Sequence, residues 1–379
     1  MPRPYSEDRE LPILRLAAAA AQEADFRPCL RCRPETAPDL ASWRGTSNTV
    51  SRALALITEG ALDGDDASVE ALAVRLGIGE RHLRRLFVQH LGAPPIAVAQ
   101  TRRVLFAKQL IHETGMPMSE IALAAGFGSV RRFNEIFRQL FQLPRTALRR
   151  KSSSNSSNSG EVTLRLRYRP PYDWDSILDY LRARAIPGVE VIKNGSYFRT
   201  VGVDGSSGSV QVSHLPERES LRVTIRLPRV QALPGIVGRV RRVFDVGADI
   251  ETIDAHLSLD PRLAPFIARR PGLRAPGGWD GFELAVRAIL GQQVSVATAR
   301  RLAGQLLLSH GERVSGDFVT ERRLTHLFPE ARRLAEAKSI EIAMPSSRRT
   351  ALKDLALAAA TDPNLFRPFG TIEEAIARL

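Results

Sequence analysis

The sequence predicts a multidomain protein in which an all-α unit is followed by an α+β unit. Helical periodicity with glycine-centred turns fills the region up to about residue 150. A run without apolar side chains follows at residues 151–160, and segments with strand-like alternation begin at Glu161. The Ser/Asn-rich run is typical of a flexible linker, so we expect the two units to be mechanically independent.

The composition favours a function directed at DNA. A chain of 379 residues can hold two or three domains with cores of their own. The formal net charge of +13 favours a polyanionic partner, and double-stranded DNA is the first candidate because neutralised phosphates release counterions. The alternative is a basic surface that is merely solvated. The longest early apolar run, residues 16–21, is too short to cross a bilayer, so we expect no membrane partner and a cytoplasmic location.

The only two cysteines, Cys29 and Cys32, lie three positions apart within the N-terminal region 1–45. This spacing is too short for a structural disulfide framework. Structural zinc sites use four ligands, usually as two closely spaced pairs, so the two cysteines predict half of a zinc site. A redox motif would need a thioredoxin-like context, and the sequence shows none.

Two stretches of the region 46–150 share one pattern: VEALAVRLGIGERHLRRLF and MSEIALAAGFGSVRRFNEIF. Each predicts a short helix, a turn at Gly77 or Gly126, and a second helix, which is the helix-turn-helix pattern. The apolar side chains of the second helices recur at i, i+3 and i+4 and predict one buried stripe in each. They are Leu83, Leu86 and Phe87 in the first copy and Phe133, Ile136 and Phe137 in the second.

The outward faces of these second helices carry the candidate DNA-binding residues. The second helix of such a motif enters the major groove, where arginine can bind guanine O6 and N7 together. A solvated basic face is the alternative, but two basic copies in one register favour DNA. The candidates are Arg81, Arg84 and Arg85 in the first copy and Arg131, Arg132 and Asn134 in the second.

These motifs, joined by PPIAVAQTRRVLFAKQLI, resemble the AraC-type DNA-binding domain over roughly residues 50–150. The resemblance implies that the two recognition helices enter successive major grooves on one face of DNA. It implies base contacts from Arg81, Arg84, Arg131 and Asn134. Glu135 stands where some members carry a basic residue, which predicts weaker binding by the second helix.

The stretch AAAAAQEADFRPCLRCRPE resembles the second half of the Ada-type zinc domain. The resemblance implies that Cys29 and Cys32 are structural zinc ligands. In that family an upstream cysteine pair completes the site and supplies the methyl acceptor. The residues before Cys29 contain no cysteine, so we expect a partial domain without that acceptor.

Beyond the linker, residues 161–232 predict an antiparallel sheet with one helix. Val162, Leu164, Leu166 and Tyr168 share one face of a first strand. The segments GSYFRTVGVD, SGSVQVSHL and ESLRVTIRL repeat the alternation, and PYDWDSILDYLRARAI predicts an amphipathic helix after the first strand. From residue 233 to 379 we expect helices and no further strand.

The segment WDGFELAVRAILGQQVSVATARRLAGQ predicts a helix that is interrupted at Gly291 and followed by two glutamines. Gln292 and Gln293 mark an exposed helix junction, or they present polar side chains to a gapped base pair. Asp280 and Glu283 are interpreted as cap residues of the helix and not as catalytic bases.

The residues FELAVRAILGQQVSVATARRLA resemble the 3-methyladenine DNA glycosylase II branch of the helix-hairpin-helix superfamily, and the preceding sheet resembles the N-terminal domain of that branch. The resemblance implies that Gln293 wedges into alkylated DNA when the damaged nucleotide flips out, with Gln292 beside the pocket. It also implies hydrolysis of an N-glycosidic bond, with a carboxylate that stabilises the oxocarbenium-like sugar and with no cofactor.

The hairpin and the catalytic aspartate of that branch are expected downstream of TIEEAIARL, beyond Leu379. We therefore predict no catalytic residue within this chain and a truncated helical domain at 233–379. The similar-looking LPGIVGRVRRVFD lies upstream and is interpreted as a linker into that domain. The leading hypothesis is an alkylation-damage protein that couples transcription regulation to base excision. The alternative is an AraC-type regulator with a non-catalytic C-terminal DNA clamp.

Overall fold

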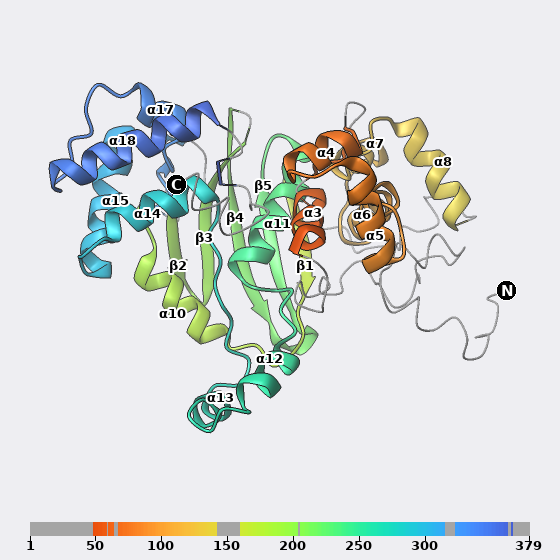
Figure 1. Cartoon of the computed structure of the whole chain (residues 1–379), viewed down its shortest axis with the longest axis horizontal. Helices are drawn as coiled ribbons and strands as arrows, with labels where there is room; N and C mark the ends of the chain where they lie inside the picture. The colour runs from red at the N-terminus through yellow and green to blue at the C-terminus, as the bar shows by residue number, and fades with distance from the viewer. Residues whose placement is uncertain are drawn as a thin grey trace. The chain divides into compact units, whose positions relative to one another are not determined.

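The computed structural model describes residues 48–58, 60–63, 67–141, 160–203, 205–314, 323–362 and 365–366. The chain divides into two compact units (Figure 1). Unit 1 comprises residues 1–156, 230–238 and 368–379, and unit 2 comprises residues 157–229 and 239–367. Cys29, Cys32 and the segment TIEEAIARL lie outside the described residues.

Unit 1 contains both predicted helix-turn-helix repeats. Its helices before residue 142 are α3 (Asn48–Thr58), α4 (Val69–Arg75), α5 (Glu80–Leu91), α6 (Pro95–Glu113), α7 (Met118–Ala124) and α8 (Val130–Phe141). Helices α4 and α5 form the first repeat, α7 and α8 form the second, and α6 links them. The turns pass through Gly77 at φ +70° and Gly126 at φ +84°, a backbone region that only glycine adopts without strain.

The buried stripes of α5 and α8 hold the two repeats together. Leu83 and Phe87 of α5 are fully buried, whereas Leu86 is only partly buried and lies at the edge of the stripe. The predicted residues of α8 are all buried, and the rings of Phe133 and Phe137 lie 4.5 Å apart between centroids. The 3.6-residue periodicity therefore identified the inward faces of both helices.

The segment before α4 is anchored on the linking helix α6. Asp63 binds Arg102 through both carboxylate oxygens, and Arg103 donates to the carbonyl of Leu62 at 2.8 Å. A β-carbon at Gly126 would come within 2.4 Å of the Asp63 carboxylate. Asp63 thus packs α6 against the turn of the second repeat.

Unit 2 begins with the predicted antiparallel sheet. Its strands are β1 (Glu161–Arg167), β2 (Glu190–Lys193), β3 (Ser196–Val203), β4 (Ser206–Leu215) and β5 (Ser220–Arg226), in the order β1-β5-β4-β3-β2. Val162, Leu164 and Leu166 are buried and alternate with more exposed residues, which confirms the predicted face of β1. The predicted helix is α10 (Trp174–Arg184), which connects β1 to β2 and packs beside β2 (Figure 1).

Helices follow the sheet, but two short strands interrupt them. The helices are α11 (Leu233–Val243), α12 (Ile250–Leu257), α13 (Ala264–Arg269), α14 (Gly281–Gly291), α15 (Val296–His310), α17 (Ala331–Glu336) and α18 (Ser346–Thr361). The strands β6 (Glu312–Arg313) and β7 (His326–Leu327) pair antiparallel, so the prediction of no further strand is wrong. Two residues are too few to show an alternating pattern. The segment interpreted as a linker into the helical domain forms α11, whose residues up to 238 belong to unit 1 and whose later residues belong to unit 2.

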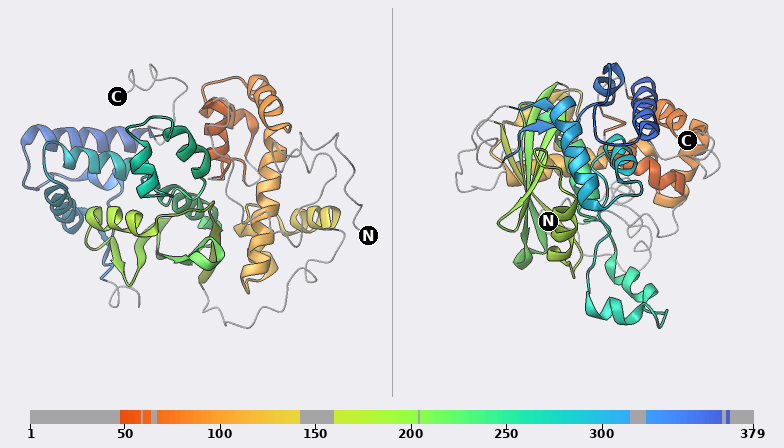
Figure 2. Two further views of the ribbon diagram at one scale, coloured as in Figure 1. Left: turned by 90° about the horizontal axis from the view of Figure 1, so that it is seen from below. Right: turned by 90° about the vertical axis from the view of Figure 1, so that its left-hand side faces the viewer.

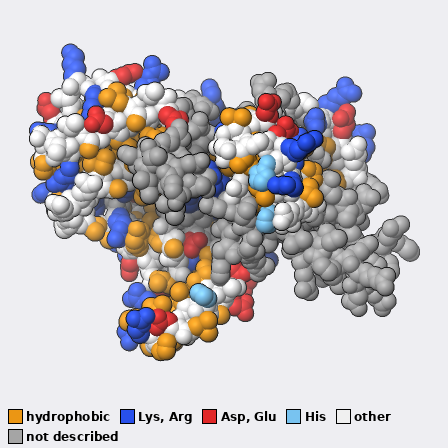
Figure 3. All heavy atoms as spheres, viewed as in Figure 1, with side chains coloured by type: hydrophobic (Ala, Val, Ile, Leu, Met, Phe, Trp, Pro, Cys, Tyr) orange, Lys and Arg blue, Asp and Glu red, His pale blue; other side chains and the backbone are white. Residues whose placement is uncertain are grey.

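Helices α12 and α13 form a small projection of unit 2, which the right-hand view of Figure 2 shows. Leu259 and Phe266 are exposed there, close in sequence to Arg262, and hydrophobic and basic side chains gather on this projection in Figure 3. The helical core of unit 2 lies among the other helices. It includes Val286, Leu290, Leu302, Leu306 and Leu352 from α14, α15 and α18.

Within the described ranges, no helix combines the length and the apolar character needed to cross a membrane.

Candidate nucleic-acid interface

The recognition helices α5 and α8 turn their predicted DNA-binding side chains away from the buried stripes. Because successive residues are about 100° apart around a helix, the positions between the buried ones face outward. Asn134 is only partly exposed. The exposed ones are Arg81, Arg84 and Arg85 of α5 and Arg131 and Arg132 of α8.

Each recognition helix also carries a carboxylate that binds one of these arginines. Arg84 pairs with Glu80 at 2.5 Å, and Arg131 pairs with Glu135 at 3.0 Å, both across one helical turn. Exposed pairs of this kind contribute only about 0.3–0.5 kcal/mol. The arginines can therefore exchange a carboxylate for a phosphate or a base edge at small cost. The sequence analysis did not predict these pairs, although the i, i+4 spacing indicates both.

The turn between α14 and α15 presents Gln292 and Gln293 to solvent. Gln292 ends α14, its N–H donating to the carbonyl of Ile289 at 3.3 Å. Ser295 caps α15 by accepting from the N–H of Thr298 at 3.2 Å. Gln292 and Gln293 therefore lie in an exposed turn between two helices, as the sequence predicted. The role of Gln293 as a wedge stays a prediction.

Gln293 has a left-handed backbone with a φ of +54°. This conformation costs a residue other than glycine about 1 kcal/mol or more and is often found at functional sites. Arg348 braces the turn from α18 by donating to the carbonyl of Gln292 at 2.9 Å. The turn is therefore contacted by α18 in addition to the two helices that it joins.

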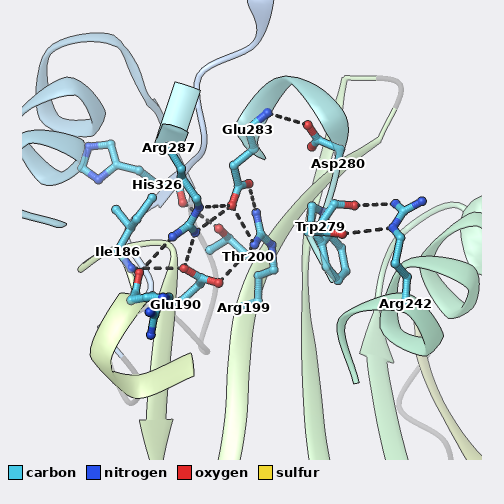
Figure 4. Close-up of polar contacts among 12 residues, drawn as sticks. Ile186, Glu190, Arg199, Thr200, Arg242, Trp279, Asp280, Glu283, Arg287 and His326 are labelled. Carbon is cyan, nitrogen blue, oxygen red and sulfur yellow. Dashed lines mark hydrogen bonds and ion pairs between the residues drawn. The ribbon is translucent and has the colours of Figure 1, made fainter. Parts of the chain in front are cut away.

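A buried ion-pair network lies at the start of α14 (Figure 4). Glu283 of α14 binds Arg199 of β3 and Arg287, whose Nη2 lies 2.7 Å from the Glu283 carboxylate. Glu190 of β2 also binds both arginines, at 3.3 Å to Arg199 and 2.5 Å to Arg287. The hydroxyl of Tyr197 donates to Glu190 at 2.8 Å. Two carboxylates and two guanidiniums thus balance one another away from water.

The network keeps both carboxylates of this region engaged. Burial opposes the ionisation of Glu283, but the guanidiniums of Arg199 and Arg287 outweigh it and lower its pKa to about 2. Burial also opposes the charge on Arg199, yet Glu283 and Glu190 raise the pKa of Arg199 above its ordinary value. Glu283 is therefore a structural anion and is not placed to act as a general acid.

Of the two residues predicted to cap α14, one does so. Asp280 caps α14, since its carboxylate accepts from the N–H of Glu283 at 2.8 Å. The interpretation of Glu283 as a second cap residue is wrong, because its side chain is drawn into the sheet by Arg199. The aromatic ring of Trp279, next to the cap, lies under the Arg199 guanidinium at 4.5 Å. Arg242 donates to the Trp279 carbonyl at 2.8 Å (Figure 4).

These contacts fix α14, and with it the glutamine turn at its end, on strands β2 and β3. The sequence analysis missed the network because its partners lie 84 and 97 residues apart in the chain. One signal was present: Arg199 stands alone as a charge within the run SYFRTVGV, whose strand is buried over most of its length. A charged residue in a buried strand calls for a partner of opposite charge.

A second cluster, which was not predicted from the sequence, consists of stacked aromatic rings around His214 of β4 and Trp174 of α10. The rings of Trp174 and His214 lie 5.3 Å apart, and those of Trp174 and Phe244 lie 5.6 Å apart. Tyr168 and His214 share a hydrogen bond of 2.7 Å. Burial lowers the pKa of His214, which favours its neutral form. The rings pack on one another, so the cluster stabilises unit 2.

In the described part of the chain, no group of three or more His, Cys, Asp or Glu residues is arranged to hold a metal ion. Cys29 and Cys32 lie outside that part, so the zinc half-site stays a prediction.

Comparison with known protein families identifies both units. Residues 72–151 match the helix-turn-helix domain family, and residues 163–280 match the AlkA N-terminal domain family. Among solved structures, a 3-methyladenine DNA-glycosylase from Archaeoglobus fulgidus is 18% identical with a TM-score of 0.44, covering 51% of this chain and 65% of that one. The C-terminal domain of the response regulator yesN from Fusobacterium nucleatum is 25% identical with a TM-score of 0.26, covering 27% of this chain and 100% of that one.

Two curated relatives are more informative. The probable bifunctional transcriptional activator/DNA repair enzyme AlkA of Mycobacterium tuberculosis is 37% identical over 352 residues, which are 92% of this chain and 69% of the relative. DNA-3-methyladenine glycosylase 2 of Escherichia coli is 33% identical over 219 residues, which are 56% of this chain and 73% of the relative. With a helix-turn-helix unit and an AlkA N-terminal domain in one polypeptide, the chain belongs to the AlkA family.

Proposed function

We propose that this chain acts on DNA in two ways: unit 1 binds specific sequences to regulate transcription, and unit 2 engages alkylated duplex DNA for removal of the damaged purine. The observation that carries the proposal is the alignment with the mycobacterial relative, which covers 92% of the chain and is named for both activities. The basic charge of the chain agrees with a DNA partner for both units.

Unit 1 would read DNA through α5 and α8. The exposed arginines of the two helices have the length and the planar donor groups to bind guanine edges in the major groove. The pairs Glu80–Arg84 and Glu135–Arg131 would open on binding. Because both helices carry such a pair, the carboxylates also disfavour binding to phosphates alone, which would favour sites that offer base contacts.

Unit 2 would act on an extruded nucleotide. Gln293 is proposed to enter the gap left in the duplex, and Gln292 to lie beside the flipped base. The strained, braced turn suits this role, since a wedge must keep its shape while the stack is opened. An alkylated purine carries positive charge and leaves readily, so binding and extrusion supply much of the catalysis. Glu283 is engaged by two arginines and is not the carboxylate that would stabilise the sugar in this step, and the aspartate expected for that role stays a prediction.

The proposal is tested with a duplex that contains a stable abasic-site analogue and an undamaged duplex of the same sequence. The full chain is expected to bind the analogue duplex at least tenfold more tightly, because an abasic site removes the cost of unpairing a base. The variant Gln293→Gly should lose most of this preference and still fold, since glycine suits the φ of +54°.

The matched control is Glu219→Gly. Glu219 has a φ of +47° and is exposed in the turn between β4 and β5, so the substitution relieves the same kind of backbone strain elsewhere in unit 2. It should leave the preference unchanged. Equal affinity of the wild-type chain for the two duplexes would refute the damage-binding part of the proposal. Release of free methylated base from alkylated DNA measures the excision step separately.

A further inference from the structure

Unit 2 contains a cavity of about 620 Å³ on the face of α15 that follows the glutamine turn. Arg300 and Arg301 of α15 line it, together with Arg323, which lies outside the helix. Leu308 and Pro187 contribute apolar wall. The cavity is large enough for a nucleotide-sized group.

Among the described residues, no carboxylate belongs to the lining of this cavity, and all three arginines are exposed. Within the described ranges, none of the three makes an ion pair or a side-chain hydrogen bond, in contrast to Arg199 and Arg287, which both pair with carboxylates in the buried network. Three positive charges on residues that line one hollow repel one another, so a bound anion would stabilise the arrangement. Arginine presents planar paired donors that match phosphate oxygens.

Glycine at position 304 keeps the cavity open. Gly304 lies in the middle of α15, where glycine costs roughly 1 kcal/mol relative to alanine. A β-carbon there would meet nothing within 4 Å, so neither packing nor backbone geometry explains this glycine. It belongs to the cavity lining, and any side chain at this position would project into the hollow.

The cavity lies close to the proposed wedge along the same helix. Arg300 and Arg301 follow the N-cap Ser295 by five and six residues, which is about 7.5–9 Å along the helix axis. Successive phosphates of one DNA strand advance by about 3.4 Å. The side chains are therefore within a few nucleotides of any base step that Gln293 enters.

We propose that the cavity lined by Arg300, Arg301 and Arg323 binds phosphate groups of the DNA strand held at the Gln292–Gln293 turn. The inference rests on the proposed function of unit 2 and adds the contact that holds the strand while the nucleotide is extruded. Arginine contacts would hold the backbone, and the apolar wall would face the sugar. A free nucleotide offers the same phosphate chemistry, so the experiment separates the two sources.

The experiment measures binding of the full chain to the abasic-analogue duplex over a range of salt concentrations. The double variant Arg300→Gln/Arg301→Gln should bind about tenfold more weakly or worse at low salt. The slope of log affinity against log salt should fall by about 0.9 for each phosphate contact that is lost. Gly304→Met should also weaken binding while keeping every charge, because its side chain fills the cavity.

The matched control is Arg218→Gln, which removes one exposed charge from the turn between β4 and β5. It should leave both the affinity and the salt slope near their wild-type values. Unchanged affinity and slope in the arginine and Gly304 variants would overturn the proposal. It would also be overturned if these variants lost binding of adenosine monophosphate, followed by calorimetry, while their DNA binding stayed intact.

A wild-type chain without any preference for the analogue duplex would instead point to failure of the proposed function. In that case the slope of log affinity against log salt, measured with undamaged DNA, still shows whether the arginine variants lose phosphate contacts.

Discussion

Glu283 shows how a single buried residue positions the candidate site of unit 2. Its carboxylate binds two guanidiniums, so removing its charge leaves Arg199 and Arg287 with only Glu190 as a counter-ion. The variant Glu283→Gln is expected to lower the free energy of unfolding of unit 2 by about 3–5 kcal/mol. Urea unfolding measures this effect through the tryptophan fluorescence of the chain, to which Trp279, whose ring lies under Arg199, contributes.

The control for this prediction is Glu336→Gln, which breaks the exposed pair between Glu336 and Arg332. That change should cost less than about 0.5 kcal/mol. A similar cost for both variants would mean that the network contributes no more than a surface pair.

The lowered pKa of Glu283 predicts that the free energy of unfolding falls at acid pH. The pKa of Glu283 is about 2 in the folded protein against 4.5 ordinarily, because its two arginine partners favour the ionised form despite burial. Its contribution is therefore complete above pH 4.5 and is lost as the pH falls towards 2. Unfolding free energies measured between pH 6 and pH 2 should decline more steeply in this window for the wild-type chain than for Glu283→Gln. Parallel curves would contradict this account.

Gly77 and Gly126 occupy equivalent turns of the two repeats but differ in their surroundings. Both have positive φ angles, so alanine at either position costs about 1–2 kcal/mol. A β-carbon at Gly77 meets nothing within 4 Å, whereas one at Gly126 would collide with Asp63 and its pair with Arg102. Gly126→Ala should therefore destabilise unit 1 by clearly more than Gly77→Ala, as measured by denaturant unfolding. Equal losses would show that the Asp63 contact is dispensable.

At the scale of elements, the two recognition helices differ less than the sequence alone indicated. Glu135 was expected to weaken the second helix, yet α5 carries an equivalent carboxylate, Glu80, that pairs with Arg84 in the same way. Glu135→Gln removes one negative charge from the exposed face of α8 and frees Arg131. We expect this variant to raise the affinity for duplex DNA by about twofold or more. The control is Glu336→Gln, which removes one negative charge from an exposed pair in unit 2. An unchanged or weaker affinity would show that Arg131 does not approach DNA.

Elements with a local pattern could be predicted, and contacts between distant segments could not. The helix-turn-helix repeats and strand β1 follow from periodicities of 3.6 and 2, which depend only on neighbouring residues. The glutamine turn was found because Gly291 interrupts an apolar helix. The helix in the segment interpreted as a linker was not predicted because its glycines suggest a break, whereas burial of Ile236 and Val240 stabilises α11. The buried network escaped prediction because it joins β2, β3 and α14.

At the scale of the whole molecule, the chain combines two DNA-directed units whose candidate sites have different chemistry. Unit 1 offers exposed arginines on helices, which suits intact base pairs in the major groove. Unit 2 offers an exposed glutamine turn and arginines that make no ion pair within the described residues, which suits a duplex with a displaced nucleotide. Because no shared residue contributes to both sites, each activity should respond to substitutions in its own unit alone.

The central claim is tested most directly by binding of two full-length variants, Arg131→Ala/Arg132→Ala and Gln293→Gly, to two duplexes. One duplex carries a sequence enriched by selection for binding to the wild-type chain, and the other carries the abasic-site analogue in an unrelated sequence. The account predicts that the double arginine variant loses sequence preference but keeps the preference for the analogue, and that Gln293→Gly shows the reverse. Loss of both preferences in either variant, with the protein still folded, would contradict it.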